Sequence, residues 1–376
     1  MTKSYGPLEP PRRLLLGPGP SMVAPRVYAA MGKPIVGIFD PFFLQLLEEI
    51  RELLKMAFGT ASEDTLVVPG TGSAGMETAV ANLVEPGTRM AVFANGFFSD
   101  RITEMARRHG ALVTRLEKPW GDVFTDAEAG EFIDRERPEV VAFVHAETST
   151  GALQPGRAIC QAAHEAGAVV IADCVTSLGA MPVLVDETGI DAAYSCSQKG
   201  LGAPPGLAPV TMSALAMERI RRRKAPPSTW YLDFLLLSDY FGIAHKYHHT
   251  VPIPMFYAMR EALVIIAEEG LENRWERHCR NHLAFVMGIE KLGLKMHVAA
   301  GDRIWSLNTP RVPGGIDDAK VRRRLFDEHG IEILGGFGPL LGKVFRIGLM
   351  GAGSTAENVR IMLSALQASL EAESRT

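Results

Sequence analysis

One lysine, Lys199, stands in a segment whose residue types favour chemistry. The segment AYSCSQKGLGAPPG follows an apolar run and surrounds Lys199 with small residues, hydroxyl groups and glycines. A lysine in water is mostly protonated, with a pKa near ~10.4. Partial burial and nearby positive charge would favour the neutral, nucleophilic amine at this position. A lone lysine after a strand is more often a surface loop residue. A catalytic role for Lys199 therefore depends on partner residues elsewhere in the chain.

An acidic residue occupies a comparable place. Asp173 ends the apolar run AVVIAD, and Lys199 comes after the next predicted strand. In a parallel α/β sheet, ligands bind at the carboxyl ends of the strands, so that both side chains can face one crevice. Alone, Asp173 would be interpreted as a helix cap or a loop carboxylate. Together with Lys199 it forms a candidate catalytic pair.

A glycine-rich loop, PGTGSAG, lies between a predicted strand and a predicted helix. Gly70, Gly72 and Gly75 match the GxGxxG pattern of dinucleotide-binding loops. That pattern normally needs an acidic residue about 20 positions later, at the end of the next strand, to hold a ribose hydroxyl. The next predicted strand, RMAVFAN, ends at Asn95 instead. An NAD-dependent oxidoreductase therefore stays as the alternative from another class, and a tight turn with nothing bound is the plain structural interpretation.

The physical chemistry of this loop still suits a phosphate group. Glycines let the backbone approach an anion closely, and the first N–H groups of the following helix point at it together with the helix dipole. Thr71 and Ser73 add hydroxyl donors. An amine, a carboxylate and a phosphate cradle are the groups that pyridoxal 5'-phosphate requires, for its aldehyde, its ring nitrogen and its anchoring. The sequence therefore predicts this cofactor, with Lys199 and Asp173 as catalytic residues.

The elements that position these residues alternate regularly. Short apolar strands alternate with helices up to about residue 200, which indicates βαβ units and a buried, mostly parallel sheet. The predicted fold class is therefore α/β. The expected strands are 64–68, 89–95, 111–117, 140–147, 168–173 and 192–197, and the expected helices between them are 73–84, 97–110 and 156–167.

The two ends of the chain have a different texture. We expect an N-terminal arm over residues 1–20, because PLEPPRRLLLGPGPSMVAPRV is rich in proline and glycine and favours extended backbone over helix. Residues 21–265 form the expected large domain, with a helix at 43–58 that ends on a glycine. Residues 254–293 have the pattern of a long helix, and a boundary near 265 leaves a smaller α+β domain at 266–376.

The composition excludes several classes of partner. The 376 residues carry a net charge of −4, with 47% hydrophobic and 22% charged residues, so that no broad basic field is present for nucleic acid or an anionic membrane. No apolar run approaches the about 20 residues of a membrane span. The N-terminal segment lacks the apolar stretch of a secretory signal, and four cysteines without a CxxC pair fit a reducing compartment, so that we expect a cytoplasmic protein. Cys174 and Cys196 stand in apolar strand contexts and are expected to pack rather than to react.

Several segments of the chain are together typical of one known family: LLLGPGPS, LVEPG, HAETSTGALQP, ADCVTSLGAMPV, GIDAAYSCSQKGLGAPPG, YHHTVP, EGLENRW and GKVFRIGLMG. The chain resembles the fold-type I, class V aminotransferases, and among them the alanine–glyoxylate and serine–pyruvate aminotransferases. The likeness runs from about Arg13 to the C-terminal helix. It implies a fold-type I PLP-transferase, with a large domain around a mostly parallel sheet and a smaller C-terminal α+β domain.

The resemblance implies roles for individual residues around the cofactor ring. Lys199 would form the Schiff base and shuttle the proton, and Asp173 would pair with the pyridinium nitrogen. Thr148 would lie at the polar edge of the ring. Phe98 stands where close relatives place a ring-stacking tryptophan, and it offers a smaller flat face without an N–H group.

Further roles concern the phosphate and the neighbouring subunit. The resemblance implies that four residues bind the phosphate: Thr71, Gly72, Ser73 and Gln198. It assigns Tyr247 and Thr250 to the phosphate of the neighbouring subunit's cofactor, which implies a homodimer with shared active sites. His245, His248 and His249 are crowded enough to suggest zinc, but no cysteine or nearby carboxylate completes a ligand set, so that no metal is expected.

On the substrate side, Arg346 would clamp an α-carboxylate with its guanidinium fork, and Gly19 would close over the site with its backbone. The implied reaction is a ping-pong transamination from a small amino acid, alanine or serine, to glyoxylate or pyruvate. A 2-aminoethylphosphonate transaminase, another class V transaminase or a cysteine desulfurase are the alternatives within the fold. A desulfurase needs a mobile, exposed cysteine near the substrate. A 2-aminoethylphosphonate transaminase would not need Arg346 as a carboxylate clamp in the same way. A cofactor-binding protein without catalysis is disfavoured because Asp173, Lys199 and Arg346 are all present.

Overall fold

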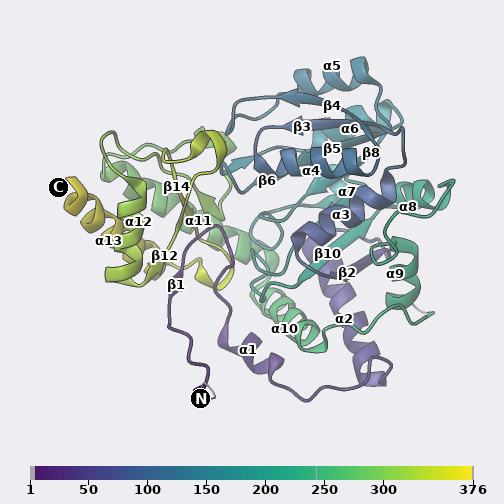
Figure 1. The fold of residues 1–376 in the computed structure, drawn as a ribbon, viewed down its shortest axis with the longest axis horizontal. Coiled ribbons are helices and arrows are strands. Elements are labelled where there is room, and N and C mark those ends of the chain that lie inside the picture. The colour runs from purple at the N-terminus through teal and green to yellow at the C-terminus, as the bar shows by residue number, and fades with distance from the viewer. Residues whose placement is uncertain (1–4, 243, 375–376) are drawn as a thin grey trace, which may run out of the picture.

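The computed structural model describes residues 5–242 and 244–374, so that residues 1–4 of the expected arm and 375–376 of the expected small domain lie outside it. A large sheet dominates the right-hand part of the molecule in Figure 1, and a smaller unit lies to its left. The sheet has seven strands in the order β2 (Thr65–Pro69), β10 (Leu207–Met212), β9 (Ala192–Tyr194), β8 (Val169–Asp173), β5 (Val140–Val144), β3 (Arg89–Ala94) and β4 (Leu112–Glu117).

The sheet is mostly parallel, as the sequence predicts. Strands β9, β8, β5, β3 and β4 run parallel to one another, whereas β10 is antiparallel to both β9 and β2. All residues of β2, β5 and β8 are buried. Strands that are buried on both faces need continuous apolar runs, which explains sequences such as VVAFV in β5. The antiparallel strand β10 was not among the expected strands.

Helices pack on this sheet and close its core. They are α2 (Pro41–Phe58), α3 (Gly72–Leu83), α4 (Phe97–Arg108), α5 (Asp126–Glu136), α6 (Arg157–Glu165), α7 (Val185–Thr188), α8 (Ala214–Arg221), α9 (Phe234–Phe241) and α10 (Ile253–Glu269). Helix α2 shows how local sequence sets the bounds. The side chain of Asp40 caps its first turn, Pro41 occupies its first position, and Gly59 ends it in the left-handed conformation at φ 67°.

Four of the expected elements differ from the structure, and the first is the strand expected at 140–147, which a bend at His145 divides into β5 and β6 (Ala146–Glu147). The proline-rich arm does not stay extended to Val27, because α1 (Pro25–Met31) begins within it at a proline that needs no N–H partner. The expected long helix is two helices, α10 and α11 (Leu271–Lys291), which Gly270 separates at φ 80°. The strand expected at 192–197 ends at Tyr194, and the chain then turns toward Lys199.

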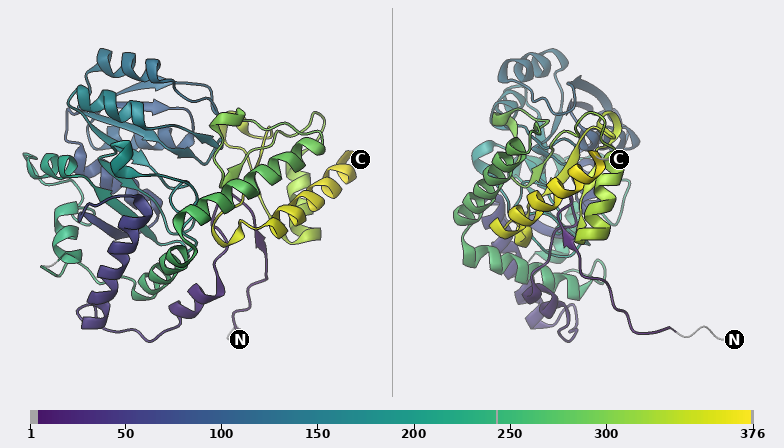
Figure 2. Two further views of the ribbon diagram at one scale, coloured as in Figure 1. Left: turned by 180° about the vertical axis from the view of Figure 1, so that it is seen from behind. Right: turned by 90° about the vertical axis from the view of Figure 1, so that its left-hand side faces the viewer.

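The smaller unit has its own apolar core. Side chains of α11 and of the segments after it pack together with Leu16 from the N-terminal arm. Figure 2 shows α11 running from the large sheet region into this unit. The remaining elements are β1 (Leu14–Leu15), β6 (Ala146–Glu147), β7 (Ala152–Leu153), η1 (Ala300–Asp302), β11 (Leu307–Asn308), α12 (Asp318–His329), β12 (Ile331–Glu332), β13 (Leu334–Gly335), η2 (Gly338–Leu340), β14 (Phe345–Gly348), η3 (Gly351–Gly353) and α13 (Ala356–Ser374). The exact domain boundary near residue 265 stays a prediction.

A buried arginine joins α11 to the turns of the large sheet. The guanidinium of Arg274 donates to the carbonyl oxygens of Gly179 and Gly200 at 2.7 Å each, and pairs with Glu269 at 2.7 Å. Gly200 directly follows Lys199, so that this contact fixes the backbone beside the lysine. Burial lowers the pKa of Arg274 from its usual value, and the charge of Glu269 opposes this.

Replacing Arg274 should therefore destabilise the fold. In an Arg274→Ala variant, two buried carbonyl groups lose their donor, and we expect the free energy of unfolding to fall by about 3 kcal/mol. Urea denaturation followed by circular dichroism measures this change. The control is Arg323→Ala, because the Arg323 side chain is 83% exposed in its pair with Asp327. Equal unfolding midpoints for the two variants would contradict the role of Arg274.

Candidate functional site

Lys199 lies in the turn after β9, at the carboxyl end of the parallel strands. Its Nζ atom donates a hydrogen bond to the carbonyl oxygen of Pro18 in the N-terminal arm. Burial lowers the pKa of the amine from its usual value, the thiol of Cys196 opposes this, and the positive charge of Arg346 adds to the lowering. A lysine in these surroundings is neutral at lower pH than a lysine in water, and a neutral amine is a nucleophile and a base.

Hydrogen bonds hold the N-terminal arm over this lysine. The N–H group of Ser21 donates to the carbonyl oxygen of Gln198 at 2.9 Å, and the hydroxyl of Ser21 donates to that of Lys199 at 2.9 Å. Gly19 has a φ of +123°, and a Cβ atom there would lie 2.5 Å from Lys199 Nζ. The position therefore excludes any side chain, and the backbone of Gly19 lies directly beside the amine.

Asp173 presents a buried carboxylate at the end of β8. It is 1% exposed, its Oδ1 accepts the N–H of Val175 at 2.9 Å, and its Oδ2 accepts the hydroxyl of Tyr194 at 2.9 Å. Burial raises the pKa of Asp173 to about 6, although these hydrogen bonds and the charges of Arg101 and Lys199 oppose the rise. A carboxylate in such a place gains from a cationic partner, because charges interact strongly where water is excluded.

The glycine loop opens helix α3 without a capping side chain. Thr71 is the exposed N-cap residue of α3 and makes no side-chain cap hydrogen bond. The first N–H groups of the helix are therefore available to a ligand. A Cβ atom on Gly72 would lie 3.1 Å from Cys196 Cβ, which keeps this position small. Ser73 Oγ accepts a hydrogen bond from Arg101 Nη1 at 3.1 Å. The side-chain Oε1 of Gln198 is buried without a partner among the described residues.

These features fit a phosphate group and a flat ring. The backbone donors of α3 and the hydroxyls of Thr71 and Ser73 can bind a phosphate. Gln198, one residue before the lysine, carries an NH₂ donor beside its unpartnered Oε1. Phe98, in the first turn of α4, supplies an aromatic face, with its ring centroid 5.6 Å from that of Phe97. The amine and the buried carboxylate lie close enough to affect each other's pKa.

Glu147 holds the helix that carries Phe98, and sequence reasoning missed it. Its Oε2 accepts the N–H of Phe98 at 3.1 Å, and its Oε1 accepts the hydroxyl of Ser149 at 2.6 Å. Ser149 Oγ in turn accepts the N–H of Phe97 at 3.0 Å. The available signal was an acidic residue at the end of the apolar run VVAFVHAE. Burial raises the pKa of Glu147 to about 7, against the hydrogen bonds of Ser149.

Arg346 is a buried cation on β14 with donors to spare. It is 2% exposed, its Nε donates to the carbonyl oxygen of Gly335 at 2.7 Å, and its Nη1 donates to that of Thr148 at 3.4 Å. The ring of Phe337 lies 3.8 Å from its guanidinium carbon. Burial lowers the pKa of Arg346 to about 10, although the charge of Glu147 opposes this, and the group therefore stays charged at neutral pH.

Two of the predicted site residues lie elsewhere in the structure. Tyr247 is 63% exposed and its ring packs edge-on against that of Phe39, with centroids 6.4 Å apart. Its hydroxyl lies 3.5 Å from Thr250 Oγ1, and Thr250 is exposed as well. Within one chain, these contacts link Tyr247 and Thr250 to the surface near α2. Their expected role toward a neighbouring subunit stays a prediction.

The cysteines and histidines show no sign of a second reaction centre. Cys160, Cys174 and Cys196 are buried, and burial raises the pKa of each thiol. In the ranges that the structure describes, no three His, Cys, Asp or Glu side chains gather as metal ligands. His248 stacks on Trp230 instead, with ring centroids 4.1 Å apart. None of the described helices has both the length and the apolar character of a membrane span.

The raised pKa of Glu147 predicts a pH dependence of stability. Glu147 binds its proton more tightly in the folded chain, with a pKa of about 7, than in the unfolded chain, near ~4.3. The folded state therefore holds more protons between these values, and its stability falls as the pH rises through this window. We expect Glu147→Gln, which cannot ionise, to lose less stability than the wild type between pH 5 and pH 8 in urea denaturation.

The matched control for this prediction is Glu128→Gln. Lys118 is the main cause that lowers the pKa of Glu128 to about 2, so that Glu128 stays ionised throughout that range and its replacement leaves the slope unchanged. A Glu147→Gln variant with the same dependence of stability on pH as the wild type would contradict the buried titration.

The chain is similar to known proteins over nearly its whole length. The family model "Aminotransferase class-V" matches residues 38–340. The alanine–glyoxylate aminotransferase of Callithrix jacchus is 39% identical over 370 residues, which cover 97% of this chain and 89% of the relative. The (S)-ureidoglycine–glyoxylate transaminase of Bacillus subtilis (strain 168) is 38% identical over 378 residues, which cover 96% and 91%. A crystal structure of an alanine–glyoxylate aminotransferase from Nostoc sp. superposes with a TM-score of 0.97 at 47% identity and covers 98% of both chains.

The comparisons agree with the fold and decide between the classes of enzyme. The Nostoc structure has the fold-type I architecture that the sequence led us to expect. The family match includes the glycine loop, which removes the support for a nicotinamide-dependent oxidoreductase that rested on GxGxxG alone. The class V family implies pyridoxal phosphate as its cofactor. This chain belongs to the class V aminotransferase family.

Proposed function

We propose that this chain is a pyridoxal-phosphate-dependent transaminase that moves an amino group from alanine or serine to glyoxylate or pyruvate. The observation that carries the proposal is the position of the half-buried Lys199, whose amine contacts the carbonyl of Pro18 at the carboxyl end of the parallel strands. Burial lowers the pKa of this amine, the charge of Arg346 adds to the lowering, and the charge of Asp173 opposes it. The names of the relatives support the acceptor, because enzymes described for different donors, alanine and (S)-ureidoglycine, share glyoxylate.

The residues described above would hold the cofactor in a defined orientation. Lys199 would bind it covalently, Phe98 would stack on its ring, and Thr148 would lie at its polar edge. The phosphate would bind to four residues: Thr71, Gly72, Ser73 and Gln198. When bound, pyridoxal phosphate supplies a protonated ring that withdraws electrons from the reacting carbon of the substrate.

Asp173 would keep a proton on the ring nitrogen of the bound cofactor. Its carboxylate is buried and meets a hydroxyl and a backbone N–H rather than a cation at close range. A protonated ring nitrogen is the cation that this site lacks, and its charge would favour the ionised carboxylate. Tyr194 fixes the orientation of Asp173, because its hydroxyl donates to Oδ2 from the neighbouring strand β9.

Lys199 moves the proton of the substrate. With the donor bound in the site, Nζ would be a free amine able to take the proton from the donor Cα. In the second half of the ping-pong reaction, the same atom returns a proton to Cα of the new amino acid. The Pro18 carbonyl accepts a hydrogen bond from Nζ and keeps the amine on the covered side of the site.

Arg346 orients the substrate through its α-carboxylate. A guanidinium matches a carboxylate with two parallel hydrogen bonds, and the carbonyl oxygens of Gly335 and Thr148 hold this one in place. The backbone at Gly19 lies directly beside the amine, where a side chain would strike Lys199, and would close over the site. A guanidinium also binds a phosphonate, so that the likeness to enzymes named for amino acid donors, rather than Arg346, favours amino acids over 2-aminoethylphosphonate.

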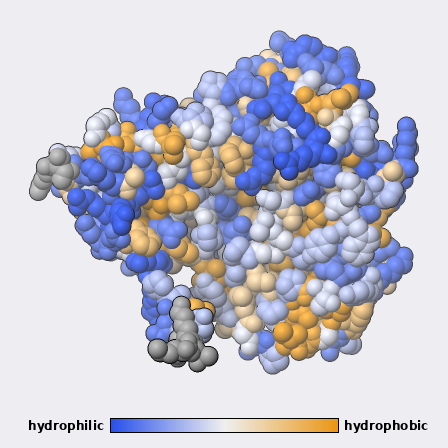
Figure 3. All heavy atoms as spheres, viewed as in Figure 1, coloured by the Kyte–Doolittle hydropathy of each residue, from blue (hydrophilic) through white to orange (hydrophobic). Residues whose placement is uncertain are grey.

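We also propose a homodimer in which Tyr247 and Thr250 reach the phosphate of the partner's cofactor. Five aromatic side chains of α2, of the segment before it and of the segments on either side of α9 are exposed, and the rings of Phe39 and Tyr247 are in contact: Phe39, Phe42, Trp230, Tyr231 and Tyr247. Figure 3 shows an apolar patch at the lower right of the visible face, over the start of α2. Monomeric proteins rarely leave such a patch in water.

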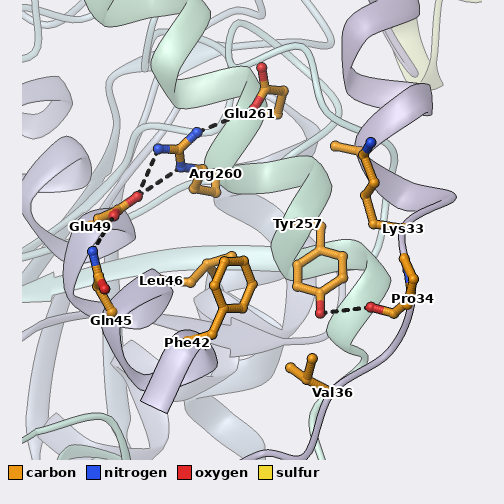
Figure 4. Close-up of a pocket in the computed structure, with 11 residues that line it drawn as sticks. Lys33, Pro34, Val36, Phe42, Gln45, Leu46, Glu49, Tyr257, Arg260 and Glu261 are labelled. Carbon is orange, nitrogen blue, oxygen red and sulfur yellow. Dashed lines mark hydrogen bonds and ion pairs between the residues drawn. The ribbon is translucent and has the colours of Figure 1, made fainter. Parts of the chain in front are cut away.

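A groove of about 570 Å³ lies beside this patch, between α2, α10 and the segment before α2. Figure 4 shows Phe42 and Leu46 next to Tyr257, whose hydroxyl donates to the carbonyl oxygen of Pro34 at 3.1 Å. Arg260 pairs with Glu49 at 2.8 Å on its far side. This groove is separate from the lysine site and gives a second subunit a shaped surface on which to pack.

Loss of the amine should abolish turnover. We expect Lys199→Ala to lower kcat with alanine and glyoxylate by at least about 1,000-fold, because both proton transfers lose their base, with an unchanged circular dichroism spectrum. A coupled assay over alanine, serine, (S)-ureidoglycine and 2-aminoethylphosphonate measures kcat/KM for each donor. Lys295→Ala, at an exposed position, is the control. Wild-type rates in the Lys199 variant, or a colourless wild type that oxidises NADH, would refute the proposed function.

A charge within the aromatic patch should break the dimer. We expect Phe42→Asp to shift the sedimentation coefficient to that of a monomer and to weaken cofactor binding, since Tyr247 and Thr250 would leave the partner's site. Leu283→Asp is the control, because Leu283 is 54% exposed on α11. If both variants keep the wild-type mass, the patch is not the subunit interface.

A further inference from the structure

Arg101 brings a positive charge to the glycine loop, from a different helix. It lies on α4, and its Nη1 donates to Ser73 Oγ at 3.1 Å in the first turn of α3. The N-terminus of a helix already carries a partial positive charge. The guanidinium of Arg101 and the N-terminus of α3 therefore face each other with the same sign.

No carboxylate neutralises this pair of charges at close range. Among the described residues, Arg101 has no acidic side chain within ion-pair distance, and its neighbour Asp100 pairs with Arg115 at 2.5 Å. Asp173 is near enough for Arg101 to lower its pKa, but it makes its hydrogen bonds to Val175 and Tyr194. Positive groups that face each other without an anion repel, and an anion between them would remove the repulsion.

A second observation points to a ligand at the same place. The buried Oε1 of Gln198 has no partner among the described residues. Cys196, two positions earlier, lines Gly72 at the start of α3. Buried polar groups are almost always hydrogen-bonded in folded proteins. A phosphate accepts hydrogen bonds, so that it would pair with the NH₂ group of this amide, after a turn about the last side-chain torsion, and not with Oε1.

Arg101 also supports the aromatic face of the site. Its guanidinium carbon lies 5.0 Å from the centroid of the Phe98 ring and 5.1 Å from that of Phe97. A guanidinium at this range attracts the electron-rich face of a ring. Arg101 therefore connects the phosphate end of the site to the ring that stacks on the cofactor.

We propose that Arg101 binds the phosphate of the cofactor, opposite the N-terminus of α3, and holds Phe98 in its stacking position. This inference rests on the proposed function, since it assigns a further binding residue to the same cofactor. The phosphate accepts hydrogen bonds from Arg101 and Ser73 together, and the guanidinium supplies the full positive charge that the helix dipole alone lacks.

Two ligands separate the role in phosphate binding from the role in stacking. Full-length protein freed of cofactor is titrated with pyridoxal phosphate and with pyridoxal, which lacks the phosphate, and binding is followed by absorbance. For Arg101→Gln we expect the Kd of pyridoxal phosphate to rise about 10- to 100-fold, the usual effect of losing a hydrogen bond to a charged group. The Kd of pyridoxal should change less than about threefold, because stacking on Phe98 is second in magnitude.

Two further variants serve as controls. Arg101→Lys keeps the charge and should retain most of the affinity for pyridoxal phosphate, which also guards against a Gln variant that fails to fold. Arg108→Gln removes an arginine of α4 whose side chain is 77% exposed, and should leave both Kd values unchanged.

The outcomes distinguish this inference from the proposed function. Equal weakening of pyridoxal phosphate and pyridoxal in Arg101→Gln, or no weakening of either, would overturn the phosphate role while the wild type still binds its cofactor. A wild type that binds neither compound would instead overturn the proposed function, and this inference with it.

Discussion

The removal of one amine from water is the constraint on which the rest of the site depends. Lys199 lies under the carbonyl of Pro18 and near the guanidinium of Arg346, and burial shifts its proton equilibrium toward the neutral form. Burial has the opposite effect on Asp173, because it disfavours the negative charge and raises the pKa of the carboxyl group. A cationic ring between them would relieve the strain on the carboxylate and use the basicity of the amine, so that one environment suits both groups to the same chemistry.

The scaffold delivers these groups from separate parts of the chain. Asp173 ends β8, Lys199 follows β9 one connection later, and the glycine loop follows β2 at the far side of the antiparallel strand β10. Arg346 comes from β14 in the smaller unit and reaches the carbonyl of Thr148. Because these strands are short and fully buried, packing fixes the positions of their ends. The polar residues at those ends are therefore held in fixed positions as well.

Sequence patterns could predict which polar groups stand at strand ends, because burial and the turn chemistry are encoded locally. The mostly parallel sheet, the strand before Asp173 and the helix after the glycine loop followed from period and composition. The contacts that support these residues could not be predicted in this way. Glu147 capping the helix of Phe98, and Tyr194 donating to Asp173, are contacts between segments that are far apart in the chain, and no local pattern specifies which buried acid meets which N–H group. Strand β10 was missed for the same reason, since its pairing with β2 depends on the whole topology.

The short strand β1 gives the arm a mechanical attachment. Leu14 and Leu15 pair with β12, and the carbonyl of Leu16 accepts the N–H of Gly348, at the end of the strand that carries Arg346. The arm that covers the lysine and the strand that carries Arg346 are thus joined by backbone hydrogen bonds. A displacement of β14 by a carboxylate bound at Arg346 would therefore be transmitted to the arm, and through the carbonyl of Pro18 to the amine of Lys199.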